Sequence, residues 1–127
     1  MHITVTSVTD TVSGLIIQFT CQYGTGRGSW KAGMPLLGKE YDVELDVNCP
    51  LRAGVNVTVT DNEVPRIWDS GYQTALIAKI EDVFDNDTAS LRLGGSLILV
   101  DYEGVLPTIG TWVEVTLPLI ELSDTKI

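Results

Sequence analysis

Four acidic residues recur at every second position of one short segment of the chain. In a β-strand, residues two apart point to the same face and lie about 7 Å apart, so this spacing predicts a row of carboxylates on one face of a strand. The row is too widely spaced for one metal ion to contact all of its members. Two interpretations stay open: a docking surface for a basic protein, or a solvated face partly neutralised by bases of the same chain. The four acids are Glu40, Asp42, Glu44 and Asp46, and the bases that could oppose them are Arg52, Lys79 and Arg92.

Residues 24–31, with the sequence GTGRGSWK, form the one basic segment that also carries an aromatic residue. Its three glycines would let a backbone approach phosphate, and Trp30 beside Arg27 and Lys31 could stack on a base of a single-stranded nucleic acid. The segment lacks the GK[ST] ending of a phosphate-binding loop. The alternative is a flexible loop whose tryptophan anchors one end in the core. We expect residues 24–37 to form the longest loop of the protein.

Few residues are suited to catalysis or to metal binding. His2 is the only histidine, and chain termini usually fray, so a catalytic triad that requires an imidazole is not expected. Cys21 and Cys49 lack the paired spacing of a metal site. In the absence of a secretory signal, they are predicted to be free thiols. We therefore expect no catalytic residue, no bound metal and no cofactor.

Apolar residues recur at every second position along almost the whole chain, which is typical of β-strands. These strands must therefore position the residues described above. The turn-forming residues 85–87 predict a hairpin between two of the longer strands. Gly94-Gly95 predicts a bend within the second of these, and Pro118 predicts an edge or a bulge in the last strand. Residues 62–71 could hold one short helical turn. The predicted strands cover residues 2–6, 15–23, 40–47, 55–60, 73–84, 88–101 and 111–122.

Seven strands at this spacing predict an all-β fold in a single domain over residues 1–127. The architecture is either an antiparallel barrel, resembling the oligonucleotide/oligosaccharide-binding (OB-like) type, or a two-sheet sandwich. The long, bent hairpin favours the barrel. This resemblance concerns architecture alone, and it leaves the function open.

The overall charge narrows the choice of partners. Acids outnumber bases 17 to 8, giving a formal net charge of −9, and a field of this sign repels phosphate backbones and attracts basic proteins. No apolar run approaches the roughly 18 residues of a membrane-spanning helix, and the first residues lack the pattern of a signal peptide. We expect a soluble, cytoplasmic protein that binds no membrane.

The function predicted from the sequence is therefore that of a small acidic binding module and not of an enzyme. It would act through contacts between the acidic residues at positions 40–46 and a basic protein. The alternative is an OB-type barrel that binds single-stranded nucleic acid or a small ligand through residues 24–31. The negative charge of the chain makes nucleic acid the weaker of these partners.

Overall fold

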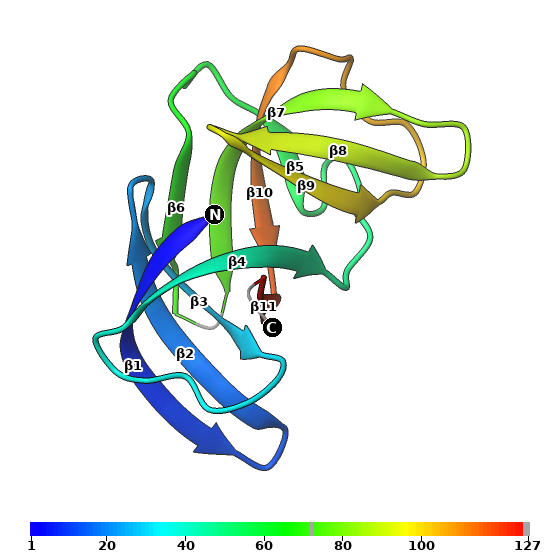
Figure 1. Cartoon of the computed structure of the whole chain (residues 1–127). Helices are drawn as coiled ribbons and strands as arrows, with labels where there is room; N and C mark the ends of the chain where they lie inside the picture. The colour runs from blue at the N-terminus through cyan, green and yellow to red at the C-terminus, as the bar shows by residue number, and fades with distance from the viewer. Residues whose placement is uncertain (72, 126–127) are drawn as a thin grey trace.

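The computed structural model describes residues 1–71 and 73–125. These residues form eleven β-strands and no helix (Figure 1). The strands are β1 (His2–Thr11), β2 (Gly14–Cys21), β3 (Gly24–Trp30), β4 (Glu40–Val47), β5 (Val57–Val59), β6 (Arg66–Asp69), β7 (Thr74–Val83), β8 (Thr88–Leu93), β9 (Ser96–Asp101), β10 (Trp112–Leu117) and β11 (Ile120–Asp124).

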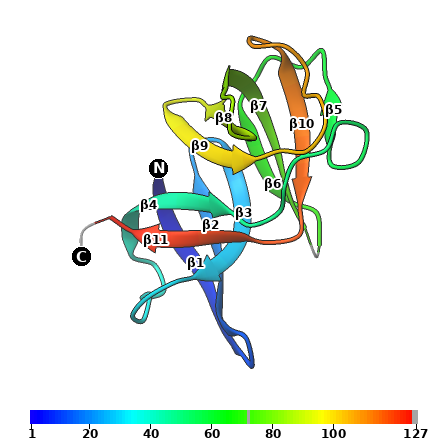
Figure 2. The same ribbon diagram turned by 90° about the vertical axis from the view of Figure 1, so that its right-hand side faces the viewer.

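Five of these strands close into a barrel. β1 pairs with β2 on one edge and with β4 on the other, and β2 pairs with β3, which gives the Greek-key order β4-β1-β2-β3. β11 completes the barrel by pairing antiparallel with β4 and parallel with β3; Figure 2 shows β11 in red beside β4. The all-β barrel predicted from the sequence is confirmed and is consistent with an OB-like barrel. Most strand pairings are antiparallel, as predicted, and the β3–β11 and β3–β6 pairings are parallel.

The strands β5 to β10 are inserted along the chain between β4 and β11, and they lie above the barrel in Figures 1 and 2. β7 is central to this group. Its first half pairs with β6 and β10, and its second half pairs with β8. β9 adds to β8, and β5 adds to β10.

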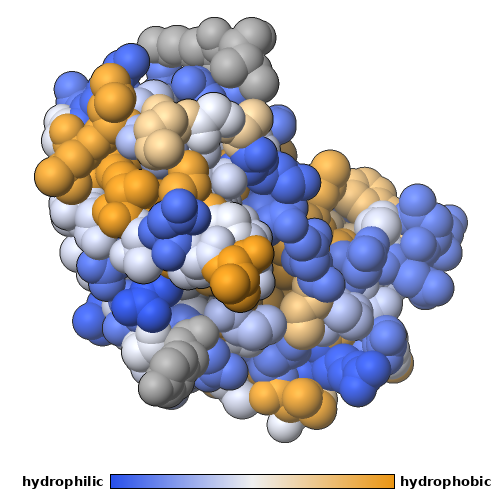
Figure 3. Space-filling view, turned by 90° about the horizontal axis from the view of Figure 1, so that it is seen from below, coloured by the Kyte–Doolittle hydropathy of each residue, from blue (hydrophilic) through white to orange (hydrophobic). Residues whose placement is uncertain are grey.

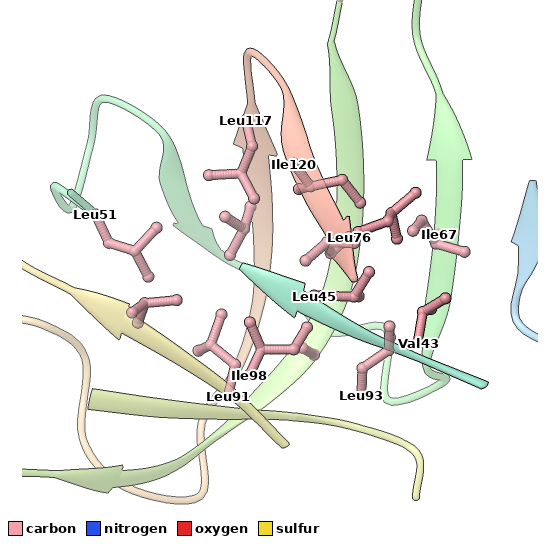
Figure 4. Close-up of a cluster of buried hydrophobic side chains, with 14 of the residues drawn as sticks. Val43, Leu45, Leu51, Ile67, Leu76, Leu91, Leu93, Ile98, Leu117 and Ile120 are labelled. Carbon is pink, nitrogen blue, oxygen red and sulfur yellow. The ribbon is translucent and has the colours of Figure 1, made fainter. Parts of the chain in front are cut away.

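One continuous hydrophobic cluster joins the barrel to the inserted strands. Figure 4 shows Val43 and Leu45 of β4 pointing toward the same region as Leu76 of β7, Ile98 of β9 and Ile120 of β11. All five side chains are buried. The inserted strands therefore cover an apolar surface of the barrel. One face of β4 packs against this shared core, and its other face points away from the core.

The structure has four more strands than the seven predicted: two long predicted strands are each divided, and β3 and β6 form in segments where no strand was predicted. Gly94 adopts a positive φ of 59°, and a left-handed residue reverses the chain where only a bend was expected. Residues 88–101 therefore form β8 and β9. Pro118 separates β10 from β11, consistent with its inability to donate a ladder hydrogen bond. The predicted hairpin around residues 85–87 is confirmed by the pairing of Val83 with Ala89.

Two predictions about irregular segments were wrong. Residues 62–71 contain the strand β6 instead of a helical turn, and the predicted loop over residues 24–37 begins with the strand β3. In β3, Gly26 and Gly28 occupy inward positions where neighbouring groups approach closely. A Cβ atom on Gly26 would lie 2.6 Å from Cζ of Phe19, and one on Gly28 would lie 2.9 Å from the carbonyl oxygen of Ile120. These glycines serve the packing of the barrel and do not form a flexible phosphate-binding loop.

The Gly28→Ala substitution tests this account of barrel closure. The added methyl group would meet the backbone of β11, which cannot move without disturbing its pairing with β3. We expect a loss of about 1–3 kcal/mol in the free energy of unfolding, the usual range for overpacking, measured by urea denaturation. Gly95→Ala is the matched control, because the nearest atom to its added Cβ lies 3.9 Å away. Equal stability of the two variants would contradict the account.

Candidate functional site

The acidic row (Glu40, Asp42, Glu44 and Asp46) lies on the outer face of β4. The alternate residues Tyr41, Val43 and Leu45 are buried in the core, so the intervening carboxylates must point away from it. Three of the acids are exposed and Asp42 is partly buried. β4 pairs with β1 along its first residues and with β11 along the rest. The row is therefore held in place by strands on both sides.

His2 lies against the first half of the row. Its Nδ1 is 3.0 Å from Asp42 Oδ1 and its Nε2 is 3.1 Å from Glu40 Oε1. Both ring nitrogens can donate only when the imidazole is protonated, so the hydrogen bonds to Asp42 and then to Glu40 raise the pKa of His2 above 6.5. The expectation of a frayed terminus was wrong, because β1 begins at His2 and the Met1 amino group donates to the Val43 carbonyl at 2.8 Å.

Lys31 lies near the other end of the row. Its Nζ is 2.7 Å from Oε2 of Glu121, which pairs in register with Asp46 across β4 and β11. The hydrogen bond from Lys31, followed by one from Asn48, lowers the pKa of Glu121, and the same pair raises the pKa of Lys31. Within residues 1–71 and 73–125, the side chain of Glu44 in the middle of the row makes no hydrogen bond or ion pair.

The bases proposed from the sequence to oppose the row lie elsewhere. Arg52 forms an ion pair with Glu103 at 2.6 Å, and Arg92 forms one with Glu81 at 3.1 Å. Lys79 lies on β7, opposite Arg92 of β8 in the register. Sequence reasoning missed His2 and Lys31 as the neighbours of the row, because their proximity follows from pairings between distant strands.

The three residues of the predicted ligand loop do not form one site. Arg27 points outward from β3, where its Nε lies 3.2 Å from Oδ2 of Asp69 and its guanidinium donates to the Gly71 carbonyl at 2.7 Å. Trp30 is only 6% exposed, and its Nε1 donates to the Ala32 carbonyl at 2.7 Å. Lys31 is paired with Glu121 as described above. Trp30 is therefore not available to stack on a nucleotide base, whereas the predicted role as an anchor in the core agrees with its burial.

A second surface covers the outer face of β1, β2 and β3, and sequence reasoning missed it. It contains a hollow of about 540 Å³ and, further along the same strands, one of about 290 Å³. Hydroxyl and amide side chains such as Thr4, Thr20 and Gln22 line the larger hollow, which is bounded by Tyr23 and the β8–β9 turn. The hydrogen bond of 2.9 Å from the Gly95 amide to the Tyr23 hydroxyl joins these walls. Alternating polar residues in the sequence indicated the polar face, but only folding places the turn beside it.

No family model, curated protein or solved structure matches the chain. Among the described residues, no helix is long and apolar enough to cross a membrane, and no group of three or more His, Cys, Asp or Glu residues is placed to hold a metal ion. Cys21 and Cys49 are both free thiols. The two surfaces are therefore compared by their geometry and charge. The acidic row offers carboxylates, and the second surface offers mainly hydroxyl and amide groups in its hollows, with Met1 and His2 at one of them and Arg27 at the other.

The environment of His2 gives a testable titration. We expect its pKa, measured from the imidazole carbon-bound proton shifts in NMR spectra, to lie above 6.5 in the wild type and to fall toward 6.5 in Asp42→Asn, because that substitution replaces the carboxylate that contributes most to the raised pKa with a neutral amide. Glu44→Gln removes a charge from the same strand without touching His2, and it should shift the pKa much less.

The raised pKa of His2 also makes the free energy of unfolding depend on pH, and measurements of stability can check the direction of this dependence. Because folding raises the pKa of His2, the stabilisation it provides is present below pH 6.5 and is lost as the pH rises through the folded-state value. The difference in unfolding free energy between the wild type and His2→Gln should therefore be larger at pH 6 than at pH 8. A difference independent of pH would contradict the hydrogen-bonding arrangement.

Proposed function

We propose that this protein is a small acidic binding module that docks a basic protein through the acidic row of β4. The observation that carries the proposal is that β4 is paired along its whole length, with β1 at residues 40–42 and with β11 at residues 43–47, and is buried on its inner face. The backbone that carries the carboxylates of the outer face is consequently preorganised, so little backbone freedom remains to be lost when a partner binds. Glu121 of β11 lies beside Asp46, where Lys31 neutralises it, so the negative charge of this surface is concentrated on β4.

The geometry favours a partner that docks onto the outer face of β4, because all four carboxylates of the row lie on that face, whereas β1 occupies one edge along residues 40–42 and β11 occupies the other along residues 43–47. The carboxylates are about 7 Å apart along the strand, a distance close to the Debye length of about 8 Å at physiological salt. A surface with lysine or arginine at similar spacing would face several of them at once. Complementarity of this kind acts mainly on the rate of association and weakens as salt is added.

A pair of substitutions tests the role of the row. A fluorescent peptide of alternating lysine and serine is the probe, and Glu44→Gln/Asp46→Asn is the variant. We expect this variant to associate with the peptide more slowly in stopped-flow measurements and to show a weaker salt dependence of the rate, because two fixed charges are lost from the docking face.

Asp61→Asn/Glu63→Gln is the matched control, because it removes the same number of charges from an exposed segment between β5 and β6. The control should retain most of the association rate. If both variants slow association equally, net charge alone governs binding, and the row has no specific role.

The alternative function, ligand binding by an OB-type barrel, is supported by the hollows on the outer face of β1, β2 and β3. OB-folds use the face of their second and third strands for oligonucleotides or oligosaccharides. Here this face carries hydroxyl and amide groups, and its cation Arg27 is already paired with Asp69. These features favour a small uncharged polar ligand over a single-stranded nucleic acid.

Nucleic-acid binding is tested directly by fluorescence anisotropy with labelled single-stranded DNA and RNA at 0.15 M salt. We expect no saturable binding, because binding energy scales with the number of phosphates neutralised and Trp30 is buried. Micromolar binding that is lost in Arg27→Gln would make nucleic acid the better partner. The variant Lys79→Gln, on another part of the molecule, controls for the loss of one positive charge.

A further inference from the structure

The segment between β3 and β4 exposes three large apolar side chains. Met34, Leu36 and Leu37 are 66%, 56% and 70% exposed, and we refer to them as the apolar loop. Figure 3 views the molecule from below, and it shows hydrophobic surface gathered on one side of the face seen in that view. Apolar residues exposed together, unlike isolated ones, mark interaction surfaces on many proteins.

The backbone of this segment is held in place even though its side chains are exposed. The Leu36 amide donates to the Tyr41 hydroxyl at 2.9 Å, and the Gly38 amide donates to the Val5 carbonyl at 2.8 Å. The Lys39 amide closes a tight turn on the Leu36 carbonyl at 3.1 Å, in which Gly38 has a φ of 79° as the third residue of a type II turn requires. Pro35 is buried. The three apolar side chains are therefore presented from a fixed backbone, which reduces the entropy lost on binding.

The apolar loop leads directly into the acidic row, since Glu40 begins β4 one residue after the turn ends. The row extends about 20 Å from there. Two lysines flank the loop, but Lys31 is paired with Glu121 at 2.7 Å and Lys39 lies 5.1 Å from the centroid of the Tyr41 ring. Both cations are thus held against the protein's own surface beside the negative row.

We propose that the apolar loop and the acidic row form one docking surface for a basic protein whose lysine and arginine residues border an apolar pocket. This inference rests on the function proposed above and adds the apolar anchor to it. Charge complementarity selects this occupant, because a second copy of the chain would bring another net charge of −9, and an anionic lipid surface would also be repelled. An apolar centre with a charged border is the usual anatomy of a protein interface.

Two peptide probes separate the two parts of the surface. One alternates lysine with serine, and the other alternates lysine with leucine, so that they carry equal charge. We expect the wild type to bind the lysine/leucine peptide about tenfold more tightly than the lysine/serine peptide in fluorescence anisotropy. The variant M34S/L36S/L37S should lose most of this preference and keep its affinity for the lysine/serine peptide. Chemical shift changes on adding the lysine/leucine peptide should include both residues 32–39 and residues 40–46.

The matched control is V12S/V105S/I109S, which removes three exposed apolar side chains from other parts of the surface. It should keep the preference, and NMR spectra of both variants should show that they are folded. If the loop variant keeps the preference, or if the control loses it equally, the inference is overturned.

Two results distinguish failure of this inference from failure of the proposed function. If the wild type binds both peptides equally and in a salt-dependent manner, the acidic row remains a docking site and the apolar anchor is rejected. If neither peptide binds, both proposals are rejected. Loop-dependent binding to phosphatidylcholine or phosphatidylserine vesicles, or a loop-dependent dimer in sedimentation velocity, would assign the apolar loop to lipid or to a second copy and would also overturn the inference.

Discussion

The parallel contact between β3 and β11 is the constraint on which the rest of the structure depends. It joins segments far apart in the chain and converts the Greek-key strands β4-β1-β2-β3 into a closed barrel. The contact is possible because Gly28 presents no side chain toward Ile120, whose carbonyl oxygen would lie 2.9 Å from an added Cβ. Closure also removes the open edges that a sheet of five strands would otherwise expose.

Closure fixes the acidic row by placing β4 between β1 and β11. Like charges on one strand oppose folding unless nearby groups compensate for them, and here the compensation is concentrated at the ends. His2 contacts Glu40 and Asp42, and Lys31 contacts Glu121 beside Asp46. Glu44 lies between these groups, so the least compensated part of the row coincides with the middle of the proposed docking surface. The exposed pairs that His2 and Lys31 form each contribute little to the free energy of unfolding. The carboxylates of the row therefore remain available to a partner.

The strands inserted between β4 and β11 give the molecule its second surface. They share a core with the barrel, as Leu45, Leu76 and Ile98 show (Figure 4), and this packing brings the β8–β9 turn to Tyr23. Hydroxyl and amide side chains line the resulting hollow together with Met1 and His2, whereas the outer face of β4 carries the carboxylates of the acidic row. The apolar loop lies between β3 and β4, next to the start of the acidic row, so the charged surface is continuous with an apolar one on that side.

Local features could be predicted from the sequence: the period of two indicated strands, the spacing of the acids indicated an outward row at positions 40–46, and the turn-forming residues 85–87 indicated a hairpin. These depend on neighbours in the chain, whose geometry a strand fixes. The tertiary structure alone decided the role of the glycines in residues 24–31, which appear as a flexible loop until Phe19 and Ile120 are seen packed against them. It likewise decided that Trp30 is buried and that His2 contacts the row. Such features depend on which distant strands become neighbours, and alternation along one strand carries no information about the strand beside it.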